Sequence, residues 1–457
     1  MKKVLSIALA YVGVLVGAGF ASGQEMIQYF VSNGSKGLWG VAVAGLLFIL
    51  TGRIILSLGS YFLADAHSDV MDSIAGAWLS RAMDLAFLLT CFFIGFVMIA
   101  GAGTNLHQQF GIPVWIGSLG MILLIGAVGM LDTDKVVKVI GVITPFLVVT
   151  VLVVAVFSIF TADLTFSQAE QLSRKMSPGI SNFILSAFNY LGMCLMTGCS
   201  MAFVMGGDEV NTRAAGRGGL LGGALVAGLL GLSAVSMFLQ LDHIAGSAMP
   251  MLALGNRIHP AFGIFMSLVI LGMIFNTGVG MYYSIASRLT VKKPENFSKA
   301  LFVLLAVGFA LSFVGFETLV EKLYPVIGYV GLVLVALLLF AWLKNKGRIR
   351  QEAGRRRVLG FLFRRKYDKN LQYKESHRNT IRHLLENSPM DNEELREEID
   401  KAAQDKAEEW NQKDYETTRE EKHQIYAELE DRVEEIQDPH LKKTVLEHSD
   451  RLSNEDK

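Results

Sequence analysis

Residues 17–25 read GAGFASGQE and lie inside the first long apolar run of the chain, MKKVLSIALAYVGVLVGAGFASGQEMIQYFVSNG. Three glycines, a serine, a glutamine and a glutamate therefore occur where a membrane helix is usually most apolar. Glycine weakens a helix by about 1 kcal/mol relative to alanine, and unwound backbone in lipid is tolerated only where protein buries it or where it lines a polar cavity. The stretch therefore predicts a first membrane helix that is interrupted near its middle.

The composition is that of an integral membrane protein, because 52% of the 457 residues are hydrophobic. Although the formal net charge is zero, charged residues are sparse in one part of the chain and dense in the other. Residues 1–343 contain 17 Lys and Arg against 15 Asp and Glu, whereas residues 344–457 contain 25 against 27. We therefore expect a transmembrane domain over 1–343, a basic juxtamembrane segment over 344–369 and a charged cytoplasmic tail over 370–457.

Ten apolar segments approach or exceed the roughly 20 residues that a membrane-spanning helix needs. The predicted spans are 4–31, 37–63, 82–108, 113–131, 135–160, 180–205, 212–240, 260–288, 299–315 and 318–343. Basic residues favour the ends that are cytoplasmic when the N-terminus is inside. We therefore predict an all-α, multi-pass protein of the cell membrane with both termini in the cytoplasm.

The two halves of the predicted membrane domain show weak self-similarity. The segments DKVVKVIGVITPFLVVTVLVVAVF, from Asp134, and ETLVEKLYPVIGYVGLVLVALLLF, from Glu317, both open with charges, contain a proline and end on Phe. Chance similarity of two Val/Leu-rich helices is the alternative. Five spans followed by five predict an inverted repeat, an architecture common among secondary transporters.

An inverted repeat also predicts that the sixth span is broken like the first. The middle of the sixth span contains the small and polar residues Asn189, Tyr190, Gly192, Thr197, Gly198 and Ser200. In a broken helix, free N–H groups attract a carboxylate and free C=O groups can coordinate a cation. A pair of broken helices therefore suits a small zwitterion such as an amino acid, although glycines spaced by four, as at Gly19 and Gly23, also allow close helix packing.

Ionisable and hydroxyl residues within the spans favour the functional interpretation. Glu25 is costly inside a membrane and is by default functional. It is a candidate cation ligand, proton acceptor or partner of Arg53, unless the first span ends early and leaves it solvated. In the eighth span, Asn276 and Thr277 are candidate sodium ligands or, equally, interhelical hydrogen-bonding groups.

Residues 10–25, AYVGVLVGAGFASGQE, resemble the first helix of the YkvI-type bacterial membrane proteins. More distantly, they are similar to the amino acid–polyamine–cation superfamily with its five-plus-five LeuT-type fold. The resemblance covers residues 1 to about 343 and implies that helices 1 and 6 are broken around a substrate site. By position it implies substrate-binding residues Gly19, Phe20, Ala21, Ser22, Gly23, Asn189, Tyr190 and Gly192. It implies a sodium site formed by the backbone of Ala18 and Ala21 and by Asn276 and Thr277. Glu25 is added to these ion-coupling candidates because of its charge within the span, so that the coupling ion is either Na⁺ or H⁺.

The C-terminal part of the chain predicts contacts of a different kind. Residues 344–369 contain eleven Lys and Arg against two Asp and Glu, and Leu359, Phe361, Leu362 and Phe363 are interleaved with them. This pattern predicts binding to the anionic inner leaflet rather than to nucleic acid. Residues 370–457 predict a partly helical, solvated tail or, alternatively, a regulatory module that binds a protein partner.

Together these features predict a secondary transporter of a small solute, an amino acid or related amine, that works by alternating access and ion coupling. The alternative is a membrane solute sensor or scaffold that acts through the tail. An enzyme is less favoured, since the sequence contains no recognisable nucleophile–base set, metal cluster or nucleotide motif. We expect no cofactor beyond the coupling ion.

Overall fold

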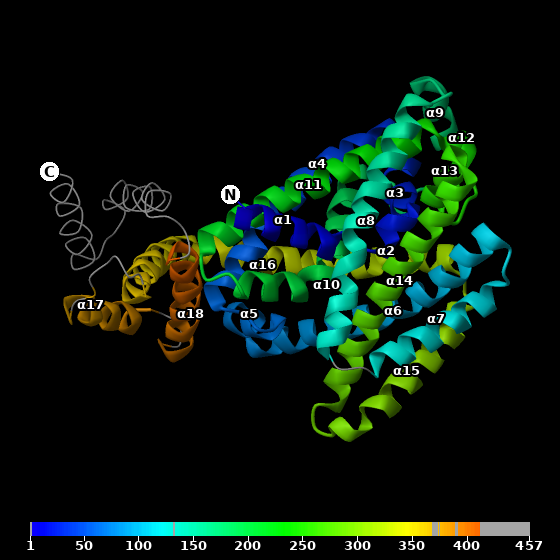
Figure 1. Ribbon diagram of the computed structural model, residues 1–457. Helices are drawn as coiled ribbons and strands as arrows, with labels where there is room; N and C mark the ends of the chain where they lie inside the picture. Colours follow the sequence, from blue (N-terminus) through cyan, green and yellow to red (C-terminus); the bar gives the residue numbers. More distant parts are fainter. Residues whose placement is uncertain (1, 131–132, 368–372, 374, 389–391, 412–457) are drawn as a thin grey trace. The chain divides into compact units, whose positions relative to one another are not determined.

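The computed structural model describes residues 2–130, 133–367, 373, 375–388 and 392–411, and its regular elements in these ranges are all helices. Within these described ranges, seven helices are long and apolar enough to cross a membrane by length and composition, and three shorter apolar helices accompany them. In chain order (Figure 1), the longer helices of the first 343 residues lie close to the predicted spans, while short helices also occur in the connections between the spans. They are α1 (Lys2–Leu15), α2 (Ala18–Ser22), α3 (Gln24–Tyr29), α4 (Ser35–Phe62), α5 (His67–Ile74), α6 (Ala77–Phe110), α7 (Val114–Gly129), α8 (Thr133–Phe160), α9 (Phe166–Ser173), α10 (Phe183–Gly207), α11 (Thr212–Leu239), α12 (Leu241–Ile244), α13 (Pro250–Ile258), α14 (Pro260–Thr290), α15 (Phe297–Ser312) and the start of α16 (Phe316–Tyr367).

The chain divides into two compact units that are interleaved in sequence. The first unit comprises Met1–Ile55, Ala66–Ala202 and Gly216–Phe340. The second comprises Leu56–Asp65, Phe203–Ala215 and Ala341–Lys457. Helices α4, α10 and α16 each contribute residues to both units.

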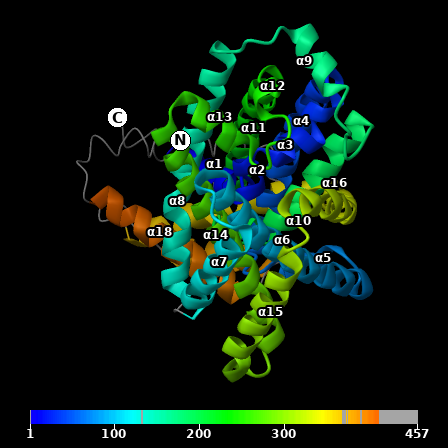
Figure 2. The same ribbon diagram turned by 90° about the vertical axis from the view of Figure 1, so that its right-hand side faces the viewer.

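In the first unit, α14 packs against α6, and α7 and α15 lie beside this pair in both views (Figures 1 and 2). Tyr282 of α14 is fully buried in this group of helices. Glycines make room for its ring, because a Cβ added at Gly95 of α6 would lie 2.9 Å from Tyr282 Cε2, and one at Gly308 of α15 would overlap the Tyr282 hydroxyl. Close packing here therefore depends on small residues, as is usual between membrane helices.

The predicted interruption of the first span is present, but the predicted interruption of the sixth span is wrong. Helix α10 is continuous over Phe183–Gly207. The Thr197 hydroxyl donates to the Cys194 carbonyl of the preceding turn, and an added Cβ at Gly192 would overlap the Gly328 carbonyl oxygen of α16. The small and polar residues of this helix therefore serve packing and internal hydrogen bonding instead of unwinding it.

The second unit contains a folded part of the tail. Helices α17 (Glu375–Glu386) and α18 (Asn392–Asn411) pack against each other and share a hydrophobic core with the last turns of α16. Four apolar residues that the sequence interleaves with basic ones belong to this core: Leu359, Phe361, Leu362 and Phe363. The contact of residues 344–369 with the anionic inner leaflet stays a prediction. Residues 412–457, which include the rest of the predicted tail helices, lie outside the described residues.

Candidate functional site

Two glycines encode the break in the first membrane helix. Gly17 has an extended backbone (φ −90°, ψ −170°) between α1 and α2. Gly23 has φ +84° and both ends α2 and begins α3. This left-handed conformation is costly for a residue with a Cβ, so the second break depends on glycine in particular.

Other helices close tightly around this break. An added Cβ at Gly23 would overlap Met237 Cε of α11 and lie 3.0 Å from the Met251 backbone nitrogen of α13. Helix α2 also packs against α14, the helix that carries Asn276 and Thr277. The side chains that were predicted to border the site from α2 are buried, namely Phe20, Ala21 and Ser22. Ala18 and Gly19 belong to α2 by their backbone, and the surroundings of both residues lie outside what the structure describes.

The break differs from a pair of long half-helices. Helix α2 has five residues and α3 has six, so neither supports a substantial macrodipole, which is a sum over many aligned peptides. What the break offers is a short run of irregular backbone inside the protein. The Ser22 hydroxyl caps part of it by accepting a hydrogen bond from the Gln24 N–H at 3.2 Å.

Glu25, on the first turn of α3, is buried. The Tyr190 hydroxyl of α10 donates a hydrogen bond of 3.1 Å to Glu25 Oε2. Glu25 is 6% exposed, so it is not solvated, while Arg53 is exposed. Among the ion pairs of the described residues, none joins Glu25 to Arg53 or to another base.

Aromatic rings pack against the Tyr190 ring and hold it in place. The Tyr190 ring centroid lies 5.2 Å from those of Tyr29 and Phe30 and 5.9 Å from that of Phe48. The two Phe contacts are edge-to-face, an arrangement that aromatic quadrupoles favour. Tyr190 is therefore held on the side of α10 that faces the broken helix.

Asn189 joins three helices. The Tyr29 hydroxyl of α3 donates to Asn189 Oδ1 at 3.2 Å, and Asn189 Nδ2 donates to the Pro325 carbonyl of α16 at 2.9 Å. The Ser186 hydroxyl, one turn earlier on α10, donates to the Tyr29 carbonyl at 2.6 Å. Each buried polar group in this chain of contacts has a partner, which is what a low-dielectric interior requires.

A proline in α16 supplies a further acceptor. Pro325 lies inside this helix and has no N–H, so the carbonyl of Glu321 four residues earlier loses its normal donor. Gln28 Nε2 of α3 donates to that carbonyl at 3.1 Å. Gln28 Oε1 is buried, and the part of the chain that the structure describes provides it with no hydrogen-bond partner. This oxygen is thus available to a water or a solute.

Some of the predicted site residues lie close together in the structure, whereas Gly192 lies apart from them. Gly23, Glu25, Asn189 and Tyr190 lie within one hydrogen-bonded and packed group that spans α2, α3 and α10. Gly192 is directed at α16 instead, where it permits close helix contact. The expected sodium ligands are half-buried on α14.

The sequence interpretation missed Gln28, Tyr29 and Ser186. Gln28 and Tyr29 follow Glu25 by three and four positions, so they share its face on a helix, and this spacing could have identified them. The role of Pro325 could have been suspected from its place within an apolar span. Its contact with Asn189 depends on the tertiary fold and leaves no signal in the local sequence.

A second polar cluster in the first unit joins α5, α6, α10 and α14. His67 Nε2 lies 3.0 Å from Asp84 Oδ1, and His67 Nδ1 lies 3.2 Å from the Ser200 hydroxyl. Asp84 Oδ2 forms an ion pair of 2.7 Å with Arg288. Burial lowers the pKa of His67, and Arg288 lowers it further, while Asp84 opposes both effects. Ser200, expected at mid-depth in a broken helix, belongs to this separate cluster.

Comparisons with known proteins identify relatives without an assigned role. No family model matches the chain. It is 24% identical over 333 residues to the uncharacterized membrane protein YkvI of Bacillus subtilis (strain 168), covering 73% of this chain and 94% of the relative. It is 24% identical over 336 residues to the uncharacterized protein YyaD of the same organism, covering 73% and 95%.

Several solved structures of transporters are similar to the chain. Inward-facing Mhp1 matches with a TM-score of 0.48 and 13% identity over 88% of this chain and 89% of that one. A manganese transporter of Eremococcus coleocola matches with a TM-score of 0.42 and 12% identity over 87% and 93%. A Na⁺-coupled sialic acid symporter matches with a TM-score of 0.41 and 11% identity over 89% and 97%.

The apolar helices and the similarity to YkvI together show that the chain is a membrane protein. The two relatives are matched over nearly their whole length by 73% of this chain. Roughly a quarter of this chain therefore has no counterpart in them, an amount comparable to residues 344–457.

Proposed function

We propose that the chain is a secondary transporter of a small solute that works by alternating access. In this proposal its ten apolar segments form a five-plus-five inverted repeat in the cell membrane, with both termini in the cytoplasm. The observation that carries the proposal is the buried Glu25 beside the irregular backbone at Gly23. A carboxylate so placed is expensive, and natural membrane proteins keep such groups for ion or solute pathways.

The charge of Glu25 needs a counterpart that the neighbouring side chains do not supply. Its described hydrogen-bond donor is the neutral Tyr190 hydroxyl, and a buried carboxylate without a cation loses several kcal/mol of solvation. A bound proton, a sodium ion or the ammonium group of a solute would each offset that loss. Glu25 is therefore the residue at which coupling between ion and solute is expected.

The class of solute follows from the groups around the break. Glu25 attracts an ammonium group, while the non-helical backbone at Gly17 and Gly23, on either side of α2, offers N–H and C=O groups to a zwitterion. Asn189, Tyr190 and the free Gln28 Oε1 add polar contacts at one side. An amino acid or related amine fits this set. Sodium, if it is the coupling ion, would bind between the backbone of Ala18 and Ala21 and the side chains of Asn276 and Thr277.

The direct test is uptake into proteoliposomes by the purified full chain. A panel of radiolabelled amino acids and amines would be offered with a Na⁺ gradient, with a proton gradient and with neither. We expect at least one solute to accumulate, and Glu25→Gln to abolish accumulation. Glu295→Gln is the matched control because Glu295 is exposed in a loop. A folded Glu25→Gln protein that accumulates solute like the parent would contradict the proposed site.

The second candidate function is a solute sensor that signals through the tail. The folded helices α17 and α18 favour it, because a purely solvated tail would not build a hydrophobic core. A thermal-shift screen of the same panel separates the two functions when it is combined with uptake. A ligand at about 100 times its Kd stabilises the protein by roughly 2.7 kcal/mol. Binding with flux indicates the transporter, and binding without flux indicates the sensor.

A further inference from the structure

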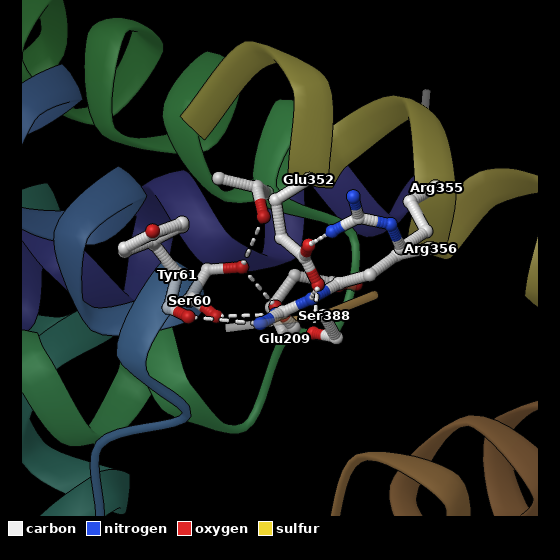
Figure 3. A network of polar contacts seen from close by, with 8 residues as sticks. Ser60, Tyr61, Glu209, Glu352, Arg355, Arg356 and Ser388 are labelled. Atoms are coloured by element: carbon white, nitrogen blue, oxygen red, sulfur yellow. Dashed lines mark hydrogen bonds and ion pairs between the residues drawn. The ribbon is translucent and has the colours of Figure 1, made fainter. Parts of the chain in front are cut away.

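The end of α4 is held by a buried arginine of α16. The last carbonyls of a helix lack intrahelical donors, and here Arg356 supplies them. Arg356 Nη1 donates to the Ser60 carbonyl at 2.6 Å, and Nη2 donates to the Tyr61 carbonyl at 2.8 Å (Figure 3). All of these residues belong to the second unit.

The Glu352 carboxylate contacts three donor side chains in the same network. Arg356 Nε donates to Glu352 Oε1 at 3.0 Å, Arg355 pairs with Oε2, and the Ser388 hydroxyl donates to Oε1 at 2.9 Å (Figure 3). The side chains of Glu352 and Arg356 are each 1% exposed. Ser388 follows α17, so one carboxylate connects the end of α4, through Arg356, with the tail helices.

The α4–α5 loop also inserts an apolar side chain into the tail. Leu63 has φ +48°, a left-handed backbone conformation that is strained for a residue with a branched side chain. Its side chain is buried in the hydrophobic core that Leu359, Leu384 and Leu395 share, and Val210 of the α10–α11 loop packs against this core. The strain is retained because tail packing holds the loop in place.

The α4 and α10 ends are joined to each other within this unit. The Ser60 hydroxyl donates to the Glu209 carbonyl at 2.6 Å. An added Cβ at Gly59 would overlap the Phe203 carbonyl oxygen, and one at Gly207 would overlap that of Ala64. The ends of both helices are therefore held in one assembly with the tail.

We propose that residues 341–411 form an inhibitory clamp that holds the cytoplasmic ends of α4 and α10 in one position and slows the transport cycle. The inference rests on the proposed transport function. Helix α10 carries Asn189 and Tyr190 and ends at Gly207 inside the clamp. Arg356 holds the end of α4, and the Ser60 hydroxyl joins that end to the Glu209 carbonyl after α10. A movement of the α10 end must therefore break the Ser60–Glu209 hydrogen bond or carry the end of α4 and the tail along.

The comparison with relatives favours a regulatory role for the clamp over a role in the transport step itself. The two relatives are matched over 94% and 95% of their length by 73% of this chain. A tail-sized part of this chain is thus additional to the common core. The buried position of Glu352 and Arg356 makes the clamp insensitive to ionic screening, so release requires displacement of the tail and not a change in salt.

The experiment compares full-length variants that loosen the clamp in steps. Ser388→Ala removes one hydrogen bond to Glu352, and Arg356→Gln removes the ion pair and the two backbone contacts. Arg348→Gln is the control, because it makes the same charge change at an exposed position of the same helix. The readouts are the initial uptake rate in proteoliposomes and backbone hydrogen exchange of residues 56–65 and 203–211.

We expect uptake to rise slightly in Ser388→Ala and several-fold in Arg356→Gln, with faster exchange in both loops and no change in Arg348→Gln. Faster exchange with unchanged or reduced uptake would overturn the inhibitory role. Unchanged exchange in Arg356→Gln would overturn the clamp itself. If the parent protein transports none of the panel, the proposed function has failed, while hydrogen exchange still decides whether the contact holds the loops.

Discussion

Tyr190 is the residue on which the buried carboxylate of Glu25 depends. Its hydroxyl is the described donor to Glu25 Oε2, while its ring packs on Tyr29, Phe30 and Phe48. The contribution of the hydroxyl can be measured separately from that of the ring, because substitution by phenylalanine keeps the ring and removes only the hydrogen-bond donor.

Tyr190→Phe should therefore lower the free energy of unfolding by about 1–3 kcal/mol, the usual loss when a buried acceptor loses its donor. Thermal unfolding of the purified protein in detergent measures the change. Tyr329→Phe is the control, since Tyr329 is 47% exposed on α16. Equal midpoints for the two variants would show that the hydroxyl of Tyr190 contributes little to the stability of the site.

At the same scale, the sequence identified Glu25, Asn189 and Tyr190 but not the contacts that unite them. Glu25 is conspicuous because a charge within an apolar run is costly. Gln28 and Ser186 are ordinary polar residues until the fold brings Pro325 and Tyr29 beside them. Composition can indicate that a residue is unusual, but it does not show which residue of a distant helix contacts it.

At the scale of elements, the two glycines around α2 differ in what they require. Gly17 is extended, and an added Cβ there meets nothing within 4 Å. Gly23 has a left-handed backbone, and an added Cβ overlaps Met237. The first glycine tolerates a side chain, whereas the second does not.

Gly23→Ala should consequently cost more than about 1 kcal/mol of stability, and it should reduce uptake because α2 or α3 must shift. Gly17→Ala should leave both properties close to those of the parent protein. Thermal unfolding and uptake of the two matched variants provide the test. A loss in Gly17→Ala as large as that in Gly23→Ala would mean that flexibility, and not backbone conformation, is what the break requires.

The contrast between α2 and α10 shows where sequence reasoning about elements fails. Both stretches combine glycine with polar residues, and only the first is interrupted. In α10, Gly192 contacts Gly328 across a helix interface. Glycine permits both unwinding and close packing, and only the neighbouring helix determines which of the two occurs. Most helix boundaries lie within a few residues of the predicted ones, but α16 continues to Tyr367, well beyond the predicted end at 343, because its polar C-terminal part is helical without being apolar.

At the scale of the whole molecule, the structure of the tail differs from what its sequence predicted. Its charge predicted a solvated segment or a module, and its interleaved Leu and Phe residues predicted a lipid contact. The structure assigns those apolar residues to a core of its own. A basic pattern with apolar residues therefore did not distinguish a membrane-binding face from the seam of a small helical bundle.

The buried ion pair in this part provides a prediction for the second unit. Arg356→Met leaves the Glu352 carboxylate buried without its main partner, which typically costs about 3–5 kcal/mol. The double variant Glu352→Gln/Arg356→Met should lose less than the sum of the single changes, because no unpaired charge remains. Hydrogen exchange of α17 and α18 measures each loss. Strict additivity would indicate that Arg356 acts through the Ser60 and Tyr61 carbonyls alone.

The burial of Glu25 has an electrical consequence. A charge that crosses the whole membrane potential gains or loses roughly 2.3 kcal/mol per 100 mV, and a carboxylate within the span senses part of that field. If Glu25 exchanges a proton or cation during each cycle, current accompanies the solute and an inside-negative voltage alters the rate. In that case patch-clamp or solid-supported-membrane recording would detect charge movement before the solute is known.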